Sequence, residues 1–555
     1  MKKARSILAL ALVCALALSG CGGAPAGSGS GSAPAPANST PAQSGGETIV
    51  TLALPGGWDS LCPLASTANN SDTACNTIFE NLFEADGKGG WIGRLGESYE
   101  VTDDGKALVV HLSKNAVWHD GEPFDADDVM FSARLVTDGS YTTSRRLFFQ
   151  GVEGCTPSGV EESEDSAHVE KLDDYTVKFY YSQPRSAAAM LAPVSSFFIM
   201  PEHLLKDADP ATILENDFWV NPIGTGPFTY ESTVPGESLT VKAFDDYYQG
   251  RPKFDKLVVR VIGTANLVTS MMAGDVDVIS GSLSAISDAD FDLAQTIEGY
   301  TVKAIEGTSS HYLVINSDVF PSAKIRKALA MMMDKDTMIQ AGCAGRASKI
   351  ETMYVPRSLY YSKETVDELR YDFDPDTAYQ MLKDEGFDFD RTYTVCINDL
   401  PVRQSMMTVM QETWAKYGMK LEIKTLDTQT CISEMRAGNC DFWINGGASA
   451  DVSNLNLTFI DWCTINEDGT YAPFNLSRIK SPTLMHLYQD LATAVEEDEI
   501  YRITAEVQKV ILTDYDYIYM ISPFINTAIS DRVTGIDEDQ MLALTMNYCD
   551  WEVKA

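Results

Sequence analysis

Residues that could perform chemistry are few along this chain, and their spacing does not suit catalysis. The six histidines stand at positions 111, 119, 168, 203, 311 and 486, and no two are four residues apart, as two zinc ligands on one helix would be. The chain contains no GxSxG, HExxH or GxxxxGK[ST] motif. We therefore expect no catalytic residue, no metal ligands and no cofactor.

Some residues that invite a catalytic interpretation have a simpler explanation. His119, within the WHDG sequence at 118–121, is expected to be a hydrogen-bonded turn residue. The acidic pairs Asp127-Asp128 and Asp245-Asp246 are expected at helix starts or on solvated faces. Carboxylates that perform acid/base catalysis must converge in a cleft, and adjacency in sequence does not provide this.

The eleven cysteines leave their pairing open. Two of them, at 14 and 21, belong to an apolar leader or its end, and the nine others are an odd number, so at least one has no partner within the chain. Cys431 with Cys440, and Cys62 with Cys75, could each close a loop. No CxxC pair occurs, so a structural zinc cluster is not expected.

The first 20 residues are typical of an export signal. A basic start is followed by twelve consecutive apolar residues at 7–18, too few to cross a ~30 Å hydrocarbon core as a helix. The leader ends in LSGC at 18–21, which resembles the lipobox of bacterial lipoproteins and implies a diacylglycerol on Cys21. The alternative is an ordinary signal peptide with an incidental cysteine. No later segment has 18 consecutive apolar residues, so this lipid would be the membrane attachment.

Residues 21–46 are expected to comprise the lipidated cysteine and a flexible linker. Positions 22–46 are almost entirely small or polar and uncharged, and such a segment cannot bury enough apolar surface to offset its chain entropy. Folded structure is expected to begin near Thr48.

The composition excludes one class of partner. The 555 residues include 42 Lys and Arg against 79 Asp and Glu, a formal net charge of -37. Such a surface repels phosphate backbones, so nucleic acid is not an expected partner. The length, with 45% hydrophobic residues, suffices for more than one domain.

The elements that would position a ligand are clearest between 371 and 446. Asp374-Pro375 indicates a helix start, and the pattern then alternates between strands and helices, at 392–397, 403–417, 420–426, 429–437 and 441–445. Strands separated by helices and short connections indicate an open α/β sheet with parallel strands. Ligands bind outside the carboxyl ends of such strands, so residues 446–451 are expected at a ligand edge.

Other elements are predicted with less context. The sequence predicts a strand at 48–54, a helix at 71–83, paired strands within 99–118 and a strand at 176–180. The acidic stretch 154–170 is expected to be a surface insertion. The stripe of Met406, Met407, Met410 and Trp414 is expected to be apolar core.

A series of sequence blocks points to a known family. The blocks are LGESYEVTDDG at 95–105, VWHDGEPF at 117–124, DDYTV at 173–177, NPIGTGPF at 221–228, GDVD at 274–277, IRKA at 325–328 and YDFDP at 371–375. In this order they resemble the extracytoplasmic solute-binding proteins of ABC importers, specifically the peptide and nickel group, family 5. The resemblance extends over about residues 50–530.

The resemblance implies an α/β fold of two lobes, the type II (cluster C) periplasmic-binding-protein arrangement, with an extra third subdomain. The expected boundaries are a signal peptide at 1–20, lobe I at 47–92, 221–308 and 519–555, the extra subdomain at 93–220, and lobe II at 309–518. Chain crossings near Ser309 and Ile521 would then form the hinge for closure over the solute.

The resemblance also implies a ligand-binding segment. In peptide-binding members, an aspartate in a Gly-Trp-x-Ala-Asp pattern binds the α-ammonium of the ligand. The matching segment is Gly447, Ala448, Ser449, Ala450 and Asp451, with Ala448 in place of the tryptophan. Asp451 is therefore expected to bind the ammonium group, and a cap or turn role is the alternative.

A second segment is expected to contact the ligand through its backbone. Thr67, Ala68 and Asn69 match the place where family members run alongside an extended peptide, a mode of strand addition that does not depend on side chains. The resemblance assigns no arginine to the peptide carboxylate.

These implications define one expected function and two alternatives. The expected function is that of a monomeric, extracytoplasmic, lipid-anchored protein that captures a small peptide and delivers it to the transmembrane subunits of an ABC permease. The first alternative is the same scaffold with a chelated metal, an oligosaccharide or another nutrient as its solute. The second is an extracytoplasmic hydrolase that uses carboxylates.

Overall fold

The computed structural model describes most of the chain after residue 45. The described residues are 46–58, 60–65, 69–140, 143–149, 151–156, 159–160, 168–281, 285–447, 455, 457, 459–466 and 468–554. Residues Glu47–Ala555 form one compact unit, which contains every element named below. Its first strand, β1 (Ile49–Leu54), begins one residue after Thr48. In the described part of the chain, no helix combines the length and apolar character that a bilayer crossing requires.

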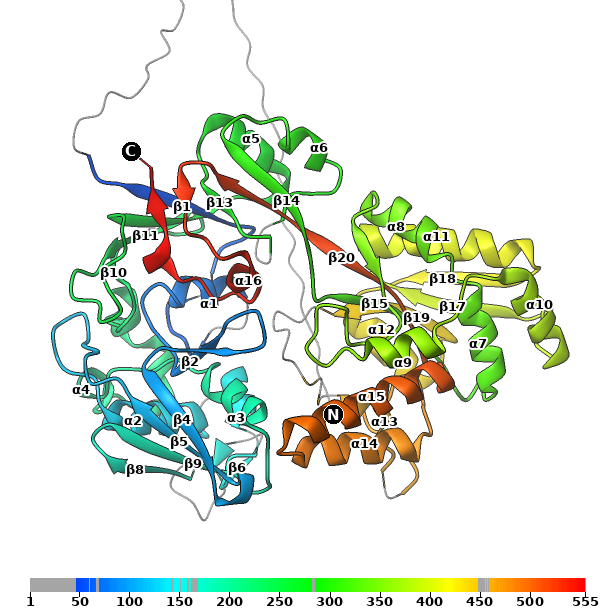
Figure 1. The fold of residues 1–555 in the computed structure, drawn as a ribbon, viewed down its shortest axis with the longest axis horizontal. Coiled ribbons are helices and arrows are strands. Elements are labelled where there is room, and N and C mark those ends of the chain that lie inside the picture. Colours follow the sequence, from blue (N-terminus) through cyan, green and yellow to red (C-terminus); the bar gives the residue numbers. More distant parts are fainter. Residues whose placement is uncertain are drawn as a thin grey trace, which may run out of the picture. The chain divides into compact units, whose positions relative to one another are not determined.

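One set of strands is drawn from distant parts of the sequence (Figure 1). It comprises β1, β10 (Phe228–Val234), β11 (Ser238–Ala243), β12 (Lys256–Val261), β13 (Val278–Ile279), β14 (Tyr300–Glu306) and the second half of β20 (Tyr517–Ser530). Strand β1 lies parallel to β12, from Ile49 opposite Lys256 to Leu54 opposite Val261. Alternation of buried residues along β1, β11 and β12 places one apolar face of this set in the core.

A second set of strands contains the parallel arrangement that the sequence predicts. It comprises β15 (Ser310–Ile315), β16 (Ala347–Lys349), β17 (Thr392–Ile397), β18 (Lys420–Thr425), β19 (Phe442–Gly447) and the first half of β20. Strand β17 is parallel to both β18 and β19. The predicted parallel α/β sheet is therefore confirmed, and β20 pairs with strands of both sets.

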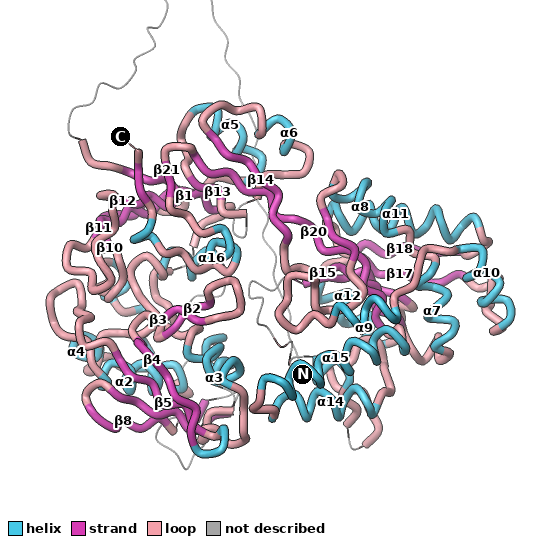
Figure 2. The backbone as a smooth tube through the Cα atoms, viewed as in Figure 1, coloured by secondary structure: helices cyan, strands magenta, loops and turns pink. Residues whose placement is uncertain are grey.

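Both faces of the second set are covered by helices, as Figure 2 shows for α8 (Lys335–Cys343) and α11 (Pro401–Lys416) on one side and α14 (Pro482–Thr493) and α15 (Glu497–Asp514) on the other. Alternate residues of β15 follow this division. Leu313 and Ile315 join the apolar cluster under α8 and α11, whereas Tyr312 and Val314 join the cluster under α14 and α15. The predicted core stripe, from Met406 to Trp414, is buried in the first of these clusters.

Local signals start and stop the predicted helices. Helix α10 (Pro375–Asp384) begins after Asp374, whose side chain accepts a hydrogen bond from the Thr377 amide. Gly386 follows its end with φ of 73°. Helix α12 (Thr428–Ala437) begins in the same way after Asp427, which accepts from the Thr430 amide.

A smaller sheet lies in the stretch expected to form the extra subdomain. Its strands follow the order β4 (Gly96–Thr102), β5 (Ala107–Leu112), β9 (Thr176–Tyr180) and β8 (Val169–Asp173). Helix α2 (Ala126–Thr137) packs beside it, and Asp128 in its first turn accepts hydrogen bonds from the Trp118 indole at 3.1 Å and the Glu202 amide at 2.9 Å. The Asp127-Asp128 pair is therefore a helix start, as expected.

The helix expected at 71–83 is wrong beyond its first turns. Helix α1 (Asn69–Cys75) ends early, and Phe83 begins β2 (Phe83–Ala85), which pairs with β3 (Trp91–Gly93). The carbonyl oxygens after α1 bond to other segments: Thr77 accepts from Phe228, Ile78 from Gly226 and Glu80 from Ile199. Backbone groups that have tertiary partners do not need an intrahelical bond.

One disulfide joins Cys396 in β17 to Cys440 just before β19, with 6.3 Å between their Cα atoms. Neither loop considered from the spacing is closed, because Cys62, Cys75 and Cys431 are all free and buried. The partners are set by the pairing of two parallel strands and not by proximity in sequence.

The other elements complete the chain. They are β6 (Cys155–Thr156), β7 (Gly159–Val160), α3 (Ala187–Val194), α4 (Glu202–Leu205), α5 (Leu267–Ala273), α6 (Phe291–Ala294), α7 (Ala323–Met331), α9 (Lys363–Leu369), α13 (Phe459–Cys463), β21 (Val533–Thr534), α16 (Glu538–Leu542) and β22 (Glu552–Val553). Most of the acidic stretch at 154–170 lies outside the described residues.

Candidate functional site

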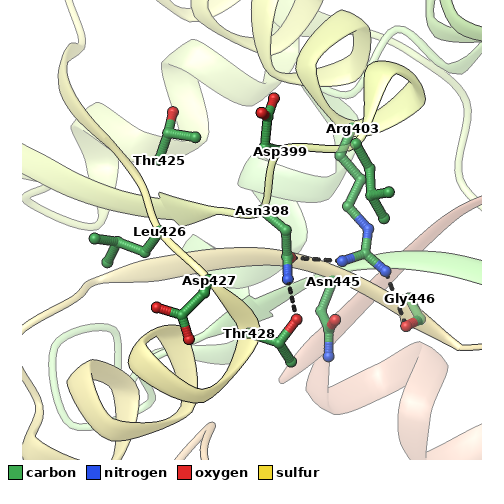
Figure 3. Close-up of a pocket in the computed structure, with 10 residues that line it drawn as sticks. Asn398, Asp399, Arg403, Thr425, Leu426, Asp427, Thr428, Asn445 and Gly446 are labelled. Atoms are coloured by element: carbon green, nitrogen blue, oxygen red, sulfur yellow. Dashed lines mark hydrogen bonds between the residues drawn. The ribbon is translucent and has the colours of Figure 1, made fainter.

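A cavity of about 620 Å³ lies where the parallel strands of the second set end (Figure 3). Its lining comes from the segments after β17 and β18 and from the last residues of β19: Asn398, Asp399, Leu400, Arg403, Thr425, Leu426, Asp427, Thr428, Asn445 and Gly446. This is the carboxyl edge of the sheet, where the sequence predicts a ligand.

Two helix N-termini border the cavity. Helix α12 is capped by Asp427, but the residue before α11 is Leu400, which has no side-chain acceptor for the first amides of that helix. Uncapped amides at a helix N-terminus attract an anionic group. The first amides of α11 therefore add positive partial charge to this side of the cavity.

Arg403, in the first turn of α11, adds a full positive charge to the amides of the helix start. The residue is only 6% exposed. Its Nη1 donates to Oδ1 of Asn398 at 2.5 Å, its Nη2 to the Gly446 carbonyl oxygen at 3.0 Å, and its Nε points to Nδ1 of His311 at 3.5 Å. All three acceptors are uncharged, and among the described residues no carboxylate forms an ion pair with Arg403. Burial lowers the pKa of Arg403, but guanidinium remains protonated in proteins.

Asn398 holds the guanidinium in place. Its Nδ2 donates to Oγ1 of Thr428 at 2.6 Å, while its Oδ1 accepts from Arg403. Figure 3 shows this chain of hydrogen bonds from the start of α12 to the arginine, together with the bond to Gly446. The loops after two different strands thus fix one buried cation at the cavity wall.

His311 does not add a second positive charge. It lies in β15 opposite Gly446 of β19, and its burial, with the nearby Arg403 charge as a smaller cause, lowers its pKa to about 4. The imidazole is therefore neutral near pH 7 and can accept the hydrogen bond from Arg403. An isolated, fixed guanidinium is suited to binding a carboxylate.

The structure describes only part of the ligand segments expected from the sequence. Gly447 is the last residue of β19, exposed and opposite Ser310, next to the cavity wall at Gly446. Asn69 is the first residue of α1. Outside the described residues lie Cys21, Thr67, Ala68, Ala448, Ser449 and Asp451.

Sequence reasoning missed Arg403 and Asn398. The sequence predicted Arg403 only as the first residue of a helix. The segment NDLPVR at 398–403, however, directly follows a predicted parallel strand. A polar residue and an arginine at the carboxyl end of such a strand are a usable signal for an anion site. The signal could not show that Arg403 has no acidic partner among the described residues.

His119 is a structural residue, as expected. Its Nδ1 accepts from the Gly224 amide at 3.2 Å, its Nε2 lies 3.0 Å from the Gly226 carbonyl oxygen, and burial lowers its pKa to about 4. Within the described residues, no group of three or more His, Cys, Asp or Glu side chains is placed to hold a metal ion.

The fold and the cavity define a class. Two sets of strands that share β20, with a cavity at the carboxyl edge of the parallel strands, fit a two-lobed α/β binding protein. Residues 90–466 match the family model for bacterial extracellular solute-binding proteins, family 5 Middle. The chain belongs to this family.

Individual relatives agree with this assignment. The chain is 25% identical over 516 residues to the oligopeptide-binding protein AppA of Bacillus subtilis, with 89% of each chain covered. It is 26% identical to the dipeptide-binding protein of Escherichia coli, covering 68% of this chain and 73% of the relative. The crystal structure of the ABC transporter substrate-binding protein CtaP of Listeria monocytogenes superposes with a TM-score of 0.77 at 21% identity, covering 92% of this chain and 100% of the other.

Proposed function

We propose that this chain is the solute-binding component of an ABC importer and that its solute is a small peptide with a free carboxylate. The observation that carries the proposal is the buried Arg403, held by uncharged acceptors at the carboxyl edge of the parallel strands. The names of the relatives, which bind oligopeptides and dipeptides, support a peptide over other carboxylates. The protein would return its solute unchanged, as a carrier and not an enzyme.

In this proposal the two charged ends of a peptide are bound by different residues. The carboxylate accepts hydrogen bonds from Arg403, and the α-ammonium pairs with Asp451, whose role follows from its position in the family pattern. Thr67, Ala68 and Asn69 would pair with the peptide backbone, and Gly447, Ala448 and Ser449 would border it. Charge-assisted bonds of this kind become stronger when closure excludes water.

Closure and delivery follow from the same proposal. Lobe I would comprise 47–92, 221–308 and 519–555, lobe II 309–518, and the extra subdomain 93–220, with the hinge near Ser309 and Ile521. Strand β20 supports the second crossing, because its residue Ile521 pairs with β15 while Phe524 pairs with β14. The permease would bind the closed form preferentially, as a shift in population. A lipid on Cys21 would keep the monomeric protein at the outer face of the membrane.

A second candidate is a carboxylated solute that is not a peptide. Arg403 binds a carboxylate whatever carries it, and Ala448 stands where the family pattern has tryptophan. Such a solute would depend on Arg403 and not on Asp451, so the variants separate the two candidates.

Calorimetric titration with a library of di- to pentapeptides tests the proposal. We expect binding by the purified protein and a loss of about 10- to 100-fold in Arg403→Gln, because a hydrogen bond to a charged group contributes about 1.5–3 kcal/mol. The same peptides with an amidated carboxyl end should bind the unsubstituted protein more weakly than the free acids do. The amidated peptides should bind Arg403→Gln as well as they bind the unsubstituted protein. Asp451→Ala should weaken peptides with a free amino end. Absence of binding by every peptide, or unchanged affinity in both variants, would overturn the proposal.

A further inference from the structure

Two carboxylates share the cavity with Arg403. Asp399 follows β17 and Asp427 follows β18, and both are exposed. Neither forms an ion pair with a lysine or arginine in the described part of the chain. Asp427 accepts hydrogen bonds from the amide and the hydroxyl of Thr430, which lower its pKa, so it carries its charge at neutral pH. Within the described residues, the wall therefore offers two carboxylates that no ion pair neutralises.

Each of these aspartates stands beside a leucine. The segment after β17 presents Asp399-Leu400, and the segment after β18 presents Leu426-Asp427. Leu400 is 44% exposed, so its apolar surface is available to a ligand side chain in the cavity. Apolar contact and a carboxylate thus occur side by side at two places around the same cavity.

Lysine and arginine side chains have the matching pattern. Their methylene stems cover apolar surface while their cationic heads remain near water or an anion. An acidic side chain in this cavity would be repelled by both aspartates. A purely apolar side chain would displace water from the two carboxylates and offer them no hydrogen bond or charge in return. Among the described residues that line the cavity, Arg403 is the one cation, and under the proposed function it binds the ligand's carboxylate.

The whole molecule favours the same ligands. A formal net charge of -37 attracts cations and repels anions over long range, which raises the encounter rate of cationic solutes. This attraction does not determine which residue of the ligand must be cationic. The aspartates do, because they lie in the same cavity as Arg403, which binds the ligand's carboxylate under the proposed function.

We infer that the cavity selects a peptide whose residue at the free carboxyl end carries a cationic side chain, lysine or arginine, with the stem on Leu400 and Leu426 and the head near Asp399 and Asp427. This inference rests on the proposed function and specifies its substrate class. Two unit charges about 4 Å apart in water attract by an amount worth about fivefold in affinity, so each aspartate should contribute about three- to fivefold at low ionic strength.

The test compares the tripeptides Ala-Ala-Lys, Lys-Ala-Ala, Ala-Ala-Ala and Ala-Ala-Glu by calorimetric titration of the purified protein. We expect Ala-Ala-Lys to bind about tenfold more tightly than Ala-Ala-Ala, and Ala-Ala-Glu to bind most weakly. Asp399→Asn and Asp427→Asn should each reduce the preference for Ala-Ala-Lys about three- to fivefold, and together remove it. Asparagine also caps helices, so Asp427→Asn keeps the start of α12.

Asp390→Asn is the matched control. Asp390 precedes β17 at the opposite end of the strand, its side chain is fully exposed, and the substitution changes the net charge by the same amount. The preference should be unchanged in this variant.

The outcomes separate the two proposals. If all four peptides bind equally, or if Lys-Ala-Ala binds as well as Ala-Ala-Lys, the inference fails while the proposed function stands. The inference is also overturned if the preference for Ala-Ala-Lys survives in the double variant that carries both Asp399→Asn and Asp427→Asn. It is overturned as well if Asp390→Asn reduces this preference as much as the cavity variants do. If none of the peptides binds, the proposed function fails and the inference with it.

Discussion

Nη1 of Arg403 donates a hydrogen bond to Oδ1 of Asn398 at 2.5 Å. The nearest partner of the buried guanidinium is therefore a neutral amide, whereas a carboxylate at the same place would neutralise its charge. A buried charge without a counter-ion is costly for stability. Under the proposed function, the arrangement keeps the positive charge available to a carboxylated solute.

Asn398→Asp tests this relationship with almost no change in shape. The new carboxylate would neutralise Arg403 from within, so the affinity for a carboxylated solute should fall at least tenfold. The midpoint of thermal unfolding should stay equal or rise, because the buried cation gains a partner. Calorimetric titration and a thermal melt measure the two effects.

Asn466→Asp serves as the control, since Asn466 lies in a loop where its side chain bonds to Thr470. It adds the same charge away from the cavity and should leave affinity unchanged. Unchanged affinity in Asn398→Asp would show that Arg403 has only a structural role.

The disulfide between Cys396 and Cys440 should stabilise the second set of strands. It closes a sequence separation of 44 residues, and replacing both cysteines by serine should lower the free energy of unfolding by about 2–4 kcal/mol. Denaturant unfolding with and without reductant measures this. Reductant should destabilise the unsubstituted protein and a Cys155→Ser control, but not the double variant; an equal response in all three would contradict the prediction.

Glu80 should make stability depend on pH. Its Oε1 accepts hydrogen bonds from the hydroxyls of Tyr247 at 2.6 Å and Tyr248 at 3.2 Å, and burial raises its pKa to about 7. The folded chain therefore keeps this proton up to about pH 7, whereas the unfolded chain releases it near its ordinary pKa of 4.5. The stability that Glu80 contributes is present at low pH and is lost as the pH rises through this interval.

Glu80→Gln removes the titration and keeps the acceptor for both tyrosines. At pH 8 the variant should be more stable than the unsubstituted protein by about 1–3 kcal/mol, and at pH 5 the two should be similar. Denaturant unfolding at the two values of pH provides the comparison. The same difference at both would rule out a proton on Glu80 as the cause.

Gly224→Ala should destabilise the first set of strands. A Cβ at this position would lie 1.9 Å from the carbonyl oxygen of Ile78, a backbone atom that also accepts from Gly226. We expect a loss of about 1–3 kcal/mol in the free energy of unfolding. Gly263→Ala, where a Cβ meets no atom within 4 Å, should cost much less. Equal losses in the two variants would count against the close approach as the reason.

Local structure was accessible from the sequence where its causes are local. Asp374-Pro375 starts α10 because a cap and an N1 proline act within one turn, and β17 matches its predicted range because alternation and flanking turns are properties of neighbouring residues. The parallel order of β17, β18 and β19 followed from the intervening helices. The ordered sequence blocks from 95 to 375 were sufficient to assign the family, and the family match over residues 90–466 confirmed this assignment.

The tertiary structure decided which distant groups meet. Cys440 pairs with Cys396 because their strands are neighbours, and α1 stops at Cys75 because the carbonyl oxygens beyond it bond to segments more than 100 residues away. Within the described residues Arg403 has only neutral acceptors, because Asn398, Gly446 and His311 surround it, and no pattern near position 403 specifies that all three are neutral. Propensity and caps act over a few residues, whereas burial and charge balance depend on every segment that packs at a site.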